Sequence, residues 1–262
     1  MMQPVLSVDT EVTLAPIPAL PEPDWKRVGQ IPITARVEQL VPTSLMPRPL
    51  LTYPVYARQG LQGAGNECLV REEVGRRLLQ AARALPDGLS LVVLDGWRPW
   101  QVQKQLFETY LDVLRQRHPE AAEEDLRERT REFVSLPSVD PNSPSPHLTG
   151  GSVDVTLCGP DGVWLDMGTP FDATVAASHT AYFEPGQPGE KHEHADLYRQ
   201  RRRLLFHIMR QAGFTNLPTE WWHFDYGNQL WAWHSGEKTA FYGPAPLEGS
   251  VPQTPLGLSG EG

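Results

Sequence analysis

The stretch SPHLTGGSVDVTL, residues 145–157, contains a histidine, a Gly-Gly pair and an aspartate near the start of a predicted strand. Alternating β-branched residues over 153–157 predict that strand. Because glycine has no Cβ, Gly150-Gly151 lets the backbone pass closely, so His147 and Asp154 can turn toward one point. An imidazole nitrogen and a carboxylate oxygen are both ligands for Zn²⁺. Taken alone, the stretch fits a glycine turn capped by an aspartate at least as well.

A second cluster, Glu220-Trp221-Trp222-His223, places a carboxylate and an imidazole among aromatic residues. Such groups are costly to bury unless they have a function. Residues three apart on a regular strand point to opposite faces. If both groups serve one site, we therefore expect Glu220 in the turn before the strand or at a bulge. A surface glutamate beside a half-buried histidine explains this cluster alone equally well.

Two further segments carry charged residues near the ends of predicted elements. Asp95-Gly96-Trp97-Arg98-Pro99 directly follows a short apolar run, residues 89–94, that predicts a buried strand. A strand end is a rigid place from which to present a working side chain, and Arg98 could stabilise an oxyanion or hold a carboxylate. In the segment 166–172, Asp172 could be a cap or the partner of a cation.

Together these residues include the parts of a mononuclear zinc hydrolase. Such an enzyme needs three protein ligands with one open position, a general base and positive charge for the oxyanion. The expected ligands are His147, Asp154 and His223, with Glu220 as the base and Arg98 as the oxyanion partner. The sequence has no H-E-x-x-H and no G-x-S-x-G, which argues against a helix-borne zincin site and a serine hydrolase elbow.

Helices and strands follow one another around these segments without a regular alternation. Apolar periodicity predicts helices over about 70–85, 99–114, 119–133 and 201–212. Aromatic residues over 221–226 and 229–233 predict two strands joined at Gly227-Asn228, as in a hairpin. The irregular mixture predicts an α+β fold, a single domain in which helices flank a central, mainly antiparallel sheet that carries the zinc site.

The two ends differ in composition from the middle of the chain. Prolines between Pro4 and Pro23 exclude a helix there, and the last residues are rich in Pro, Gly and Ser. We expect an extended N-terminal arm over residues 1–50, a catalytic domain over 51–243 and a flexible tail over 244–262. The start of the sequence shows no secretory signal, so the expected compartment is the cytoplasm.

The composition excludes several classes of protein. The chain has 262 residues, of which 40% are hydrophobic, and this is enough to build a core. A net charge of −9 argues against nucleic acid as a partner, and no apolar run is long enough to span a membrane. Two cysteines cannot make a disulfide framework or a four-thiolate zinc site. With 26 Pro and 22 Gly, the chain is expected to be rich in loops.

The motifs, in this order, resemble the D-alanyl-D-alanine dipeptidases of the vancomycin-resistance (VanX) type. These belong to the D,D-carboxypeptidase/lysostaphin-like zinc metallopeptidases (peptidase family M15), which share S-x-H-x(6)-D followed by E-x-x-H. Ser145-x-His147, Asp154 and Glu220-Trp221-Trp222-His223 match that pattern, and the segment 95–99 resembles D-G-Y-R-P with Trp for Tyr. The segments 166–172 and 178–179 resemble the part that distinguishes the dipeptidases.

The resemblance implies one Zn²⁺ per subunit on His147, Asp154 and His223, with Glu220 as base and acid. It implies Arg98 at the tetrahedral intermediate, Asp172 at the substrate ammonium and Ser145 among the groups that bind the dipeptide. A family tyrosine that contacts the substrate amine could be either Tyr53 or Tyr56. The expected partner is a small dipeptide, D-alanyl-D-alanine, and the oligomeric state stays open.

Two other functions compete with the dipeptidase. A D,D-carboxypeptidase acting on peptidoglycan precursors would cleave a pentapeptide and would be exported. A catalytically silent zinc-binding module of the same fold could lack the base or the arginine, but Glu220 and Arg98 are both present.

Overall fold

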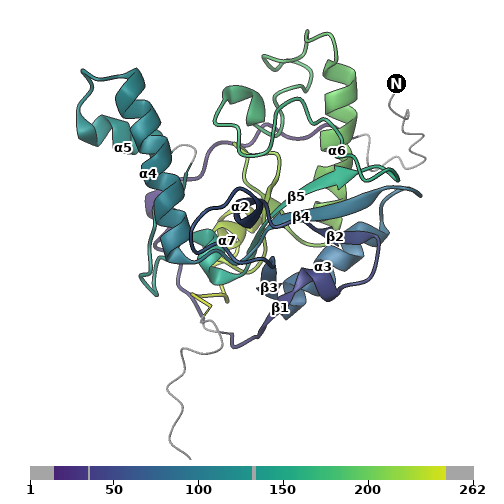
Figure 1. Ribbon diagram of the computed structural model, residues 1–262, viewed down its shortest axis with the longest axis horizontal. Coiled ribbons are helices and arrows are strands. Elements are labelled where there is room, and N and C mark those ends of the chain that lie inside the picture. Colours follow the sequence, from purple (N-terminus) through teal and green to yellow (C-terminus); the bar gives the residue numbers. More distant parts are fainter. Residues whose placement is uncertain (1–14, 35, 132–133, 246–262) are drawn as a thin grey trace, which may run out of the picture.

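The computed structural model describes residues 15–34, 36–131 and 134–245. Its centre is a five-stranded sheet in the order β2-β4-β5-β7-β6. The strands are β2 (Leu50–Thr52), β4 (Ser90–Asp95), β5 (Ser152–Cys158), β7 (His223–Asp225) and β6 (Thr215–Asn216). Only β2 and β4 run parallel, and the other neighbours are antiparallel. The predicted α+β class with a mainly antiparallel sheet is therefore confirmed (Figure 1).

Seven helices and a second, two-stranded sheet complete the described part of the chain. The small sheet pairs β1 (Leu40–Pro42) with β3 (Leu69–Arg71). The helices are α1 (Trp25–Val28), α2 (Val55–Arg58), α3 (Glu72–Arg83), α4 (Trp100–Arg117), α5 (Glu123–Arg131), α6 (Ala195–Gln211) and α7 (Gln229–Ser235). The short 3-10 turns are η2 (Thr43–Leu45), η3 (Pro146–Thr149) and η4 (Ala176–Ser178).

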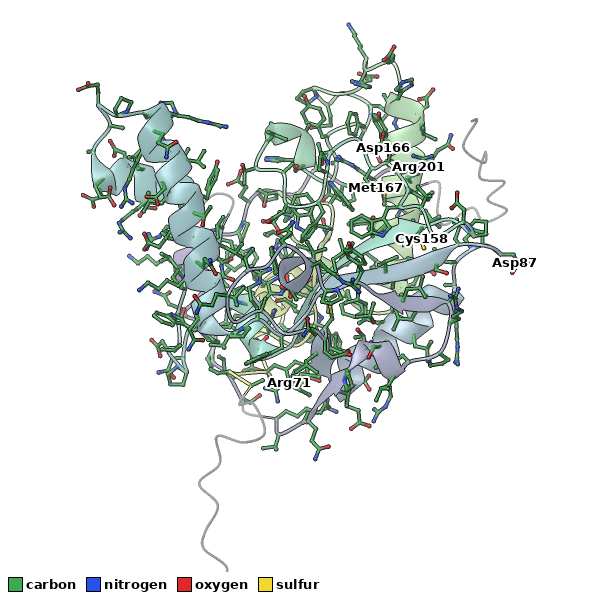
Figure 2. All side chains as sticks on the ribbon, viewed as in Figure 1. Arg71, Asp87, Cys158, Asp166, Met167 and Arg201 are labelled. Carbon is green, nitrogen blue, oxygen red and sulfur yellow. The ribbon has the colours of Figure 1, made fainter. Side chains whose placement is uncertain are left out.

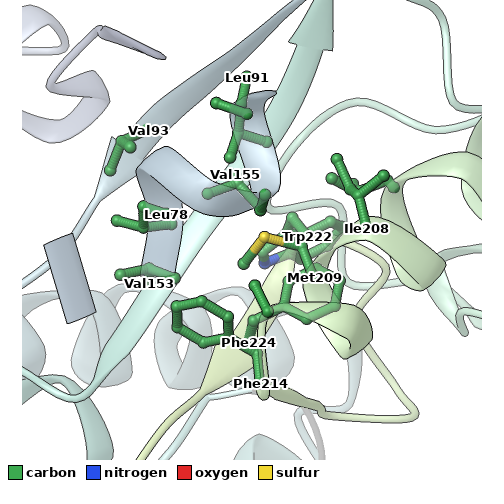
Figure 3. Close-up of a cluster of buried hydrophobic side chains, with 14 of the residues drawn as sticks. Leu78, Leu91, Val93, Val153, Val155, Ile208, Met209, Phe214, Trp222 and Phe224 are labelled. Atoms are coloured by element: carbon green, nitrogen blue, oxygen red, sulfur yellow. The ribbon is translucent and has the colours of Figure 1, made fainter. Parts of the chain in front are cut away.

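One face of the central sheet is covered by α3 and α6. Because side chains alternate along a strand, Val153, Val155 and Leu157 of β5 point to this face, as does Phe224 of β7. They pack with Leu78 of α3 and with the apolar residues of α6 in the main core (Figure 3). The same alternation leaves the intervening residues of β5 and β7 for the opposite face, where the candidate site lies.

The helices mostly agree with the predicted spans, with differences at their ends. The helix predicted over about 70–85 begins at Glu72, because Leu69–Arg71 pair as β3. The helix predicted over 201–212 begins earlier, at Ala195, and is followed by Gly213 at a left-handed φ of 91°, as expected for a C′ glycine. Helices α4 and α5 pack on each other and project from one side of the body (Figure 1).

The hairpin predicted at Gly227-Asn228 is wrong. Residues 229–235 form α7, and Asn228 is its N-cap, with a side chain that accepts a hydrogen bond from the Trp231 amide at 2.9 Å. Gly236, at a φ of 74°, follows the helix. An asparagine that could open a turn instead satisfies a free amide at the helix start.

The division into arm, domain and tail stays a prediction, and residues 1–14 and 246–262 lie outside the described part of the chain. Within the proposed arm, residues 40–42 already pair into the small sheet, and Leu50, its last residue, begins β2 of the central sheet. None of the helices in the described part of the chain combines the length and the apolar character needed to cross a bilayer. The cytoplasmic compartment stays a prediction.

Candidate metal centre

The candidate site forms where neighbouring strands bring polar side chains to the open face of the sheet. Asp154 on β5 lies directly opposite His223, the first residue of antiparallel β7. Because opposite residues on paired strands share a face, both side chains point away from the main core. The register between β5 and β7 therefore brings together two residues that are 69 positions apart.

His147 reaches the same point from η3. Gly150, at a φ of 70°, ends this turn in the left-handed region. A Cβ on Gly151 would lie 2.5 Å from the Tyr226 carbonyl oxygen, so the close approach of the two backbones requires a glycine there. The Gly-Gly pair thus has the predicted effect, turning the chain so that His147 and Asp154 meet.

The three candidate ligands form a tight, buried cluster. His147 Nε2 lies 3.2 Å from His223 Nδ1, which in turn lies 3.2 Å from Asp154 Oδ1. All three ligand atoms lie within 4.8 Å of one another, and the exposed fractions are 5%, 2% and 4% for His147, Asp154 and His223. Within the described residues, no other group of three such side chains has this arrangement.

The outer nitrogen of each imidazole is held by a second group. His147 Nδ1 lies 2.8 Å from the Gly96 carbonyl oxygen, and His223 Nε2 lies 3.1 Å from both oxygens of Asp225. When these outer nitrogens carry the proton and donate, His147 Nε2 and His223 Nδ1 are unprotonated, and these are the two nitrogens that face Asp154. Metal-binding histidines are oriented in this way. Two neutral nitrogens and one carboxylate oxygen are a donor set that fits Zn²⁺.

The charges of the cluster shift its pKa values strongly. Burial alone would raise the pKa of Asp154, but His147 and His223 hold it well below its usual range. Burial would lower the pKa of His223, but the charge of Asp225 and hydrogen bonds with Asp154 and Asp225 raise it well above the ordinary value. The site is therefore a concentration of buried negative charge that favours a cation.

Asp225 is a residue of the site that the sequence reasoning missed. It is fully buried, and besides His223 it accepts hydrogen bonds from Ser152 Oγ at 2.6 Å and Asn228 Nδ2 at 2.7 Å. Its pKa is lowered because these three donors outweigh the effect of burial. A signal was present, since Asp225 follows His223 by two residues and must share its face on a strand.

Glu220 lies in the turn before β7, which is one of the two places that its spacing from His223 allowed. Its Oε2 is 3.9 Å from His223 Nδ1, the nitrogen that faces the other ligands. Burial raises the pKa of Glu220 to about 8, with Asp154 and Asp172 adding to the shift and His223 and Arg98 opposing it. A carboxylate with a raised pKa beside a metal site is suited to accept and return a proton near neutral pH.

Arg98 lies on the other side of Asp154. Its Nη2 donates to Asp154 Oδ2 at 3.2 Å, its Nε to Asp95 Oδ2 at 2.8 Å and its Nη1 to Gln103 Oε1 at 2.8 Å. Only 8% of the side chain is exposed. The guanidinium is thus held rigidly beside one candidate ligand, and its role at an oxyanion stays a prediction.

The two tyrosines left open by the sequence lie in different places. The Tyr56 hydroxyl is 3.4 Å from Arg98 Nη2, and its ring lies 4.9 Å below the Arg98 guanidinium. Tyr53 is 40% exposed and packs edge-on against Trp164, with 5.2 Å between the ring centroids. Tyr56 is therefore the tyrosine that belongs to the site.

Asp172 completes the polar face beside Tyr56. It has a positive φ of 65°, unusual for a residue other than glycine. Desolvation by neighbouring groups raises its pKa to about 6, although Arg98 and a hydrogen bond from Tyr56 oppose the rise. The side chain stays exposed to solvent, so a ligand could reach it.

Ser145 lies next to the site, but its hydroxyl is engaged in the loop before η3. It accepts from the Ser138 amide at 2.7 Å and donates to the Leu136 carbonyl oxygen at 2.8 Å. Only 4% of the residue is exposed. A substrate contact for Ser145 stays a prediction, and the contacts seen shape the loop that leads to His147.

Comparisons with known proteins agree with the motifs. A family profile described as D-ala-D-ala dipeptidase, Peptidase_M15, matches residues 55–239. A D-alanyl-D-alanine dipeptidase of Synechocystis sp. is 33% identical over 81% of this chain and 94% of its own length. One from Escherichia coli is 31% identical over 60% of this chain and 66% of its own length.

Two solved structures are more distant. A vancomycin-resistance D,D-pentapeptidase, a VanY mutant in complex with Zn(II), is 14% identical over 80% of this chain and 96% of its own, with a TM-score of 0.41. VanYB in complex with D-Ala-D-Ala is 17% identical over 66% of this chain and 81% of its own, with a TM-score of 0.40.

Proposed function

The chain belongs to the D-Ala-D-Ala dipeptidase family, peptidase family M15, and is therefore a peptidase; from this we propose that it is a zinc-dependent dipeptidase that hydrolyses D-alanyl-D-alanine to two molecules of D-alanine. The observation that carries the proposal is the cluster of His147, Asp154 and His223 with the Glu220 carboxylate 3.9 Å from His223 Nδ1. Three ligands and an adjacent base are the minimum set for metal-assisted hydrolysis.

The two histidines and Asp154 would hold the zinc ion. When bound, Zn²⁺ would supply a Lewis acid that makes water a better nucleophile at neutral pH and polarises the peptide carbonyl. Glu220 takes the proton of the attacking water on its carboxylate and delivers it to the nitrogen of the leaving D-alanine. One water is consumed and one peptide bond is broken, and Glu220 ends the cycle in the same protonation state in which it began.

The remaining polar groups orient the dipeptide. Asp172, beside the Tyr56 hydroxyl, supplies the negative charge for the α-ammonium, which an N-terminal residue has and an internal residue lacks. Arg98 supplies positive charge for the oxyanion. Relatives named as D-alanyl-D-alanine dipeptidases support this choice of substrate. Ser145 stays a candidate for contact with the dipeptide.

Replacing the base tests the mechanism. Glu220→Gln keeps the shape of the side chain but cannot take the proton, so we expect it to retain one Zn²⁺ per chain and to lose activity by about 100-fold or more. Metal analysis and release of D-alanine are the two readouts. Glu193→Gln, at a side chain that is 81% exposed, is the matched control. Wild-type rates in Glu220→Gln would refute the assigned role.

A substrate screen separates the proposal from its competitors. The zinc-loaded enzyme is given D,D-, L,D- and L,L-dipeptides beside a pentapeptide that ends in D-Ala-D-Ala. We expect cleavage of D,D-dipeptides alone. Release of D-alanine from the pentapeptide would indicate a D,D-carboxypeptidase, and inactivity on every substrate would indicate a silent zinc-binding module.

A further inference from the structure

Arg202 on α6 is a buried charged residue that the proposed mechanism does not use. Only 2% of it is exposed. Its guanidinium donates to the carbonyl oxygens of Met167 at 2.8 Å, His179 at 2.7 Å and Ala177 at 2.8 Å. Its Cζ lies 4.6 Å from the ring centroid of Phe183. Burial lowers the pKa of Arg202 to about 9, which reflects how costly it is to remove this charge from water.

The three carbonyls belong to the two ends of one loop. We call residues 167–179 the Asp172 loop, because Asp172 lies near its middle. Met167 is its first residue, while Ala177 and His179 lie at its other end. The neighbouring Arg201 donates to the Asp166 carbonyl oxygen, just before the loop, so α6 lies against its first residues (Figure 2). One guanidinium therefore closes the loop.

The loop has a conformation that its surroundings must hold in place. Asp172 is in the left-handed region at a φ of 65°, which costs about 1 kcal/mol or more for a residue with a Cβ. Inside the loop, Ser178 Oγ donates to the Ala173 carbonyl oxygen at 2.6 Å. Trp221, next to the proposed base, donates from Nε1 to Thr169 Oγ1 at 2.8 Å. The loop is thus held from α6, from within and from the Glu220 turn.

We propose that Arg202 is a positioning residue for substrate specificity: by holding both ends of the Asp172 loop, it fixes the Asp172 carboxylate where the α-ammonium of the dipeptide binds. The inference rests on the proposed role of Asp172. The planar fork of an arginine spreads its donors over three nitrogens, so it can reach three diverging carbonyls. The three donors of a lysine leave from a single nitrogen and cannot match them. Without the fork the loop samples other conformations, and the apparent affinity falls with the competent fraction.

The test compares two ligands that differ only in the amine. D-Ala-D-Ala has the α-ammonium, and N-propionyl-D-alanine is the same molecule without it. In the zinc-loaded, full-length enzyme we expect Arg202→Lys and Arg202→Met to raise KM for D-Ala-D-Ala about tenfold. We expect kcat to stay within about threefold and the inhibition constant of N-propionyl-D-alanine within about twofold, because only binding of the ammonium is weakened.

Three further variants make the result decisive. Arg203→Met removes a neighbouring guanidinium of α6 that pairs with Glu184, outside the Asp172 loop, and should leave both constants unchanged. Ser178→Ala, which removes a contact within the loop, should raise KM in the same direction and carries the test if Arg202→Met does not fold. Asp172→Asn should have the same effect as the Arg202 variants: a higher KM for D-Ala-D-Ala and an unchanged inhibition constant of N-propionyl-D-alanine. Hydrogen exchange over residues 168–178 should accelerate in Arg202→Lys but not in Arg203→Met.

The possible failures are distinguishable. If Asp172→Asn leaves KM unchanged, the proposed role of Asp172 in ammonium binding is wrong. If Asp172→Asn raises KM but the Arg202 variants do not, the positioning role is overturned. An equal loss for both ligands, or a loss in kcat alone, would assign Arg202 to general structure and would also overturn it.

Discussion

The substitution Asp225→Asn tests whether the group behind His223 controls metal affinity. Asp225 Oδ1 accepts from Ser152, Asn228 and His223, while Oδ2, among the described residues, accepts from His223 alone, at 3.1 Å. Asparagine keeps the shape, and its oxygen can replace Oδ1. Its amide group then faces His223 Nε2, and two N–H groups cannot hydrogen-bond to each other.

The conflict is relieved if His223 moves its proton to Nδ1, the nitrogen that faces Asp154. That tautomer cannot bind a metal through Nδ1. Before zinc can bind, the proton must return to Nε2, against the conflict with the asparagine amide. Loss of such an outer-shell partner typically lowers metal affinity by about 10- to 100-fold. This range corresponds to about 1.4–2.7 kcal/mol. We expect Asp225→Asn to fall within it, without loss of the three ligands themselves.

The assay is a titration of metal-free protein with Zn²⁺ in competition with a chromophoric chelator at neutral pH. Asp87→Asn is the matched control, since Asp87 is exposed in a turn at the edge of the molecule (Figure 2). A zinc affinity for Asp225→Asn within about threefold of wild type would refute the argument that Asp225 sets the tautomer of His223.

Four other outcomes are expected. The pKa of Asp172 is raised to about 6, so its negative charge is present above that pH and is lost as the pH falls through it. KM for the dipeptide should therefore rise by about tenfold from pH 7 to 5. A KM that does not change over this range would contradict the prediction. Arg98→Lys should lower kcat in steady-state assays by about 100-fold or more, since the fork to Asp95 and Asp154 is lost. Tyr56→Phe should raise KM severalfold whereas Tyr53→Phe should not, and equal effects would place the substrate elsewhere. Leu78→Ala, in the main core, should lower the free energy of unfolding by about 2–5 kcal/mol in denaturant titrations while leaving one zinc per folded chain.

Local patterns predicted the elements that depend on neighbours in sequence. The apolar run 89–94 became β4, the alternating residues 153–157 lie within β5, and Gly213 follows the end of α6. The strand period also limited Glu220 to the turn before the strand or to a bulge if it and His223 were to face one point, and the structure has the turn.

Prediction from local patterns failed where one pattern is compatible with more than one structure. Gly227-Asn228 between aromatic residues satisfies the pattern of a hairpin, but Asn228 caps α7. The local sequence cannot distinguish a hairpin turn from a helix N-cap here, because the outcome depends on whether residues 229–235 pair with another strand or pack as a helix. The Tyr53 and Tyr56 alternatives were open for a similar reason. Tyr53 lies between β2 and α2 and Tyr56 lies in α2, so which of them faces the site depends on how this short helix packs.

By itself, the sequence determined which residues could act as ligands, base and charge partners, because the chemistry of a side chain does not depend on the fold. The Gly-Gly turn also determined that His147 and Asp154 could meet. Only the tertiary structure decided that Asp154 lies opposite His223, that Asp225 sits behind His223, and that Arg202 closes the Asp172 loop. These are contacts between distant segments, and they depend on strand register and helix packing, which no local pattern specifies.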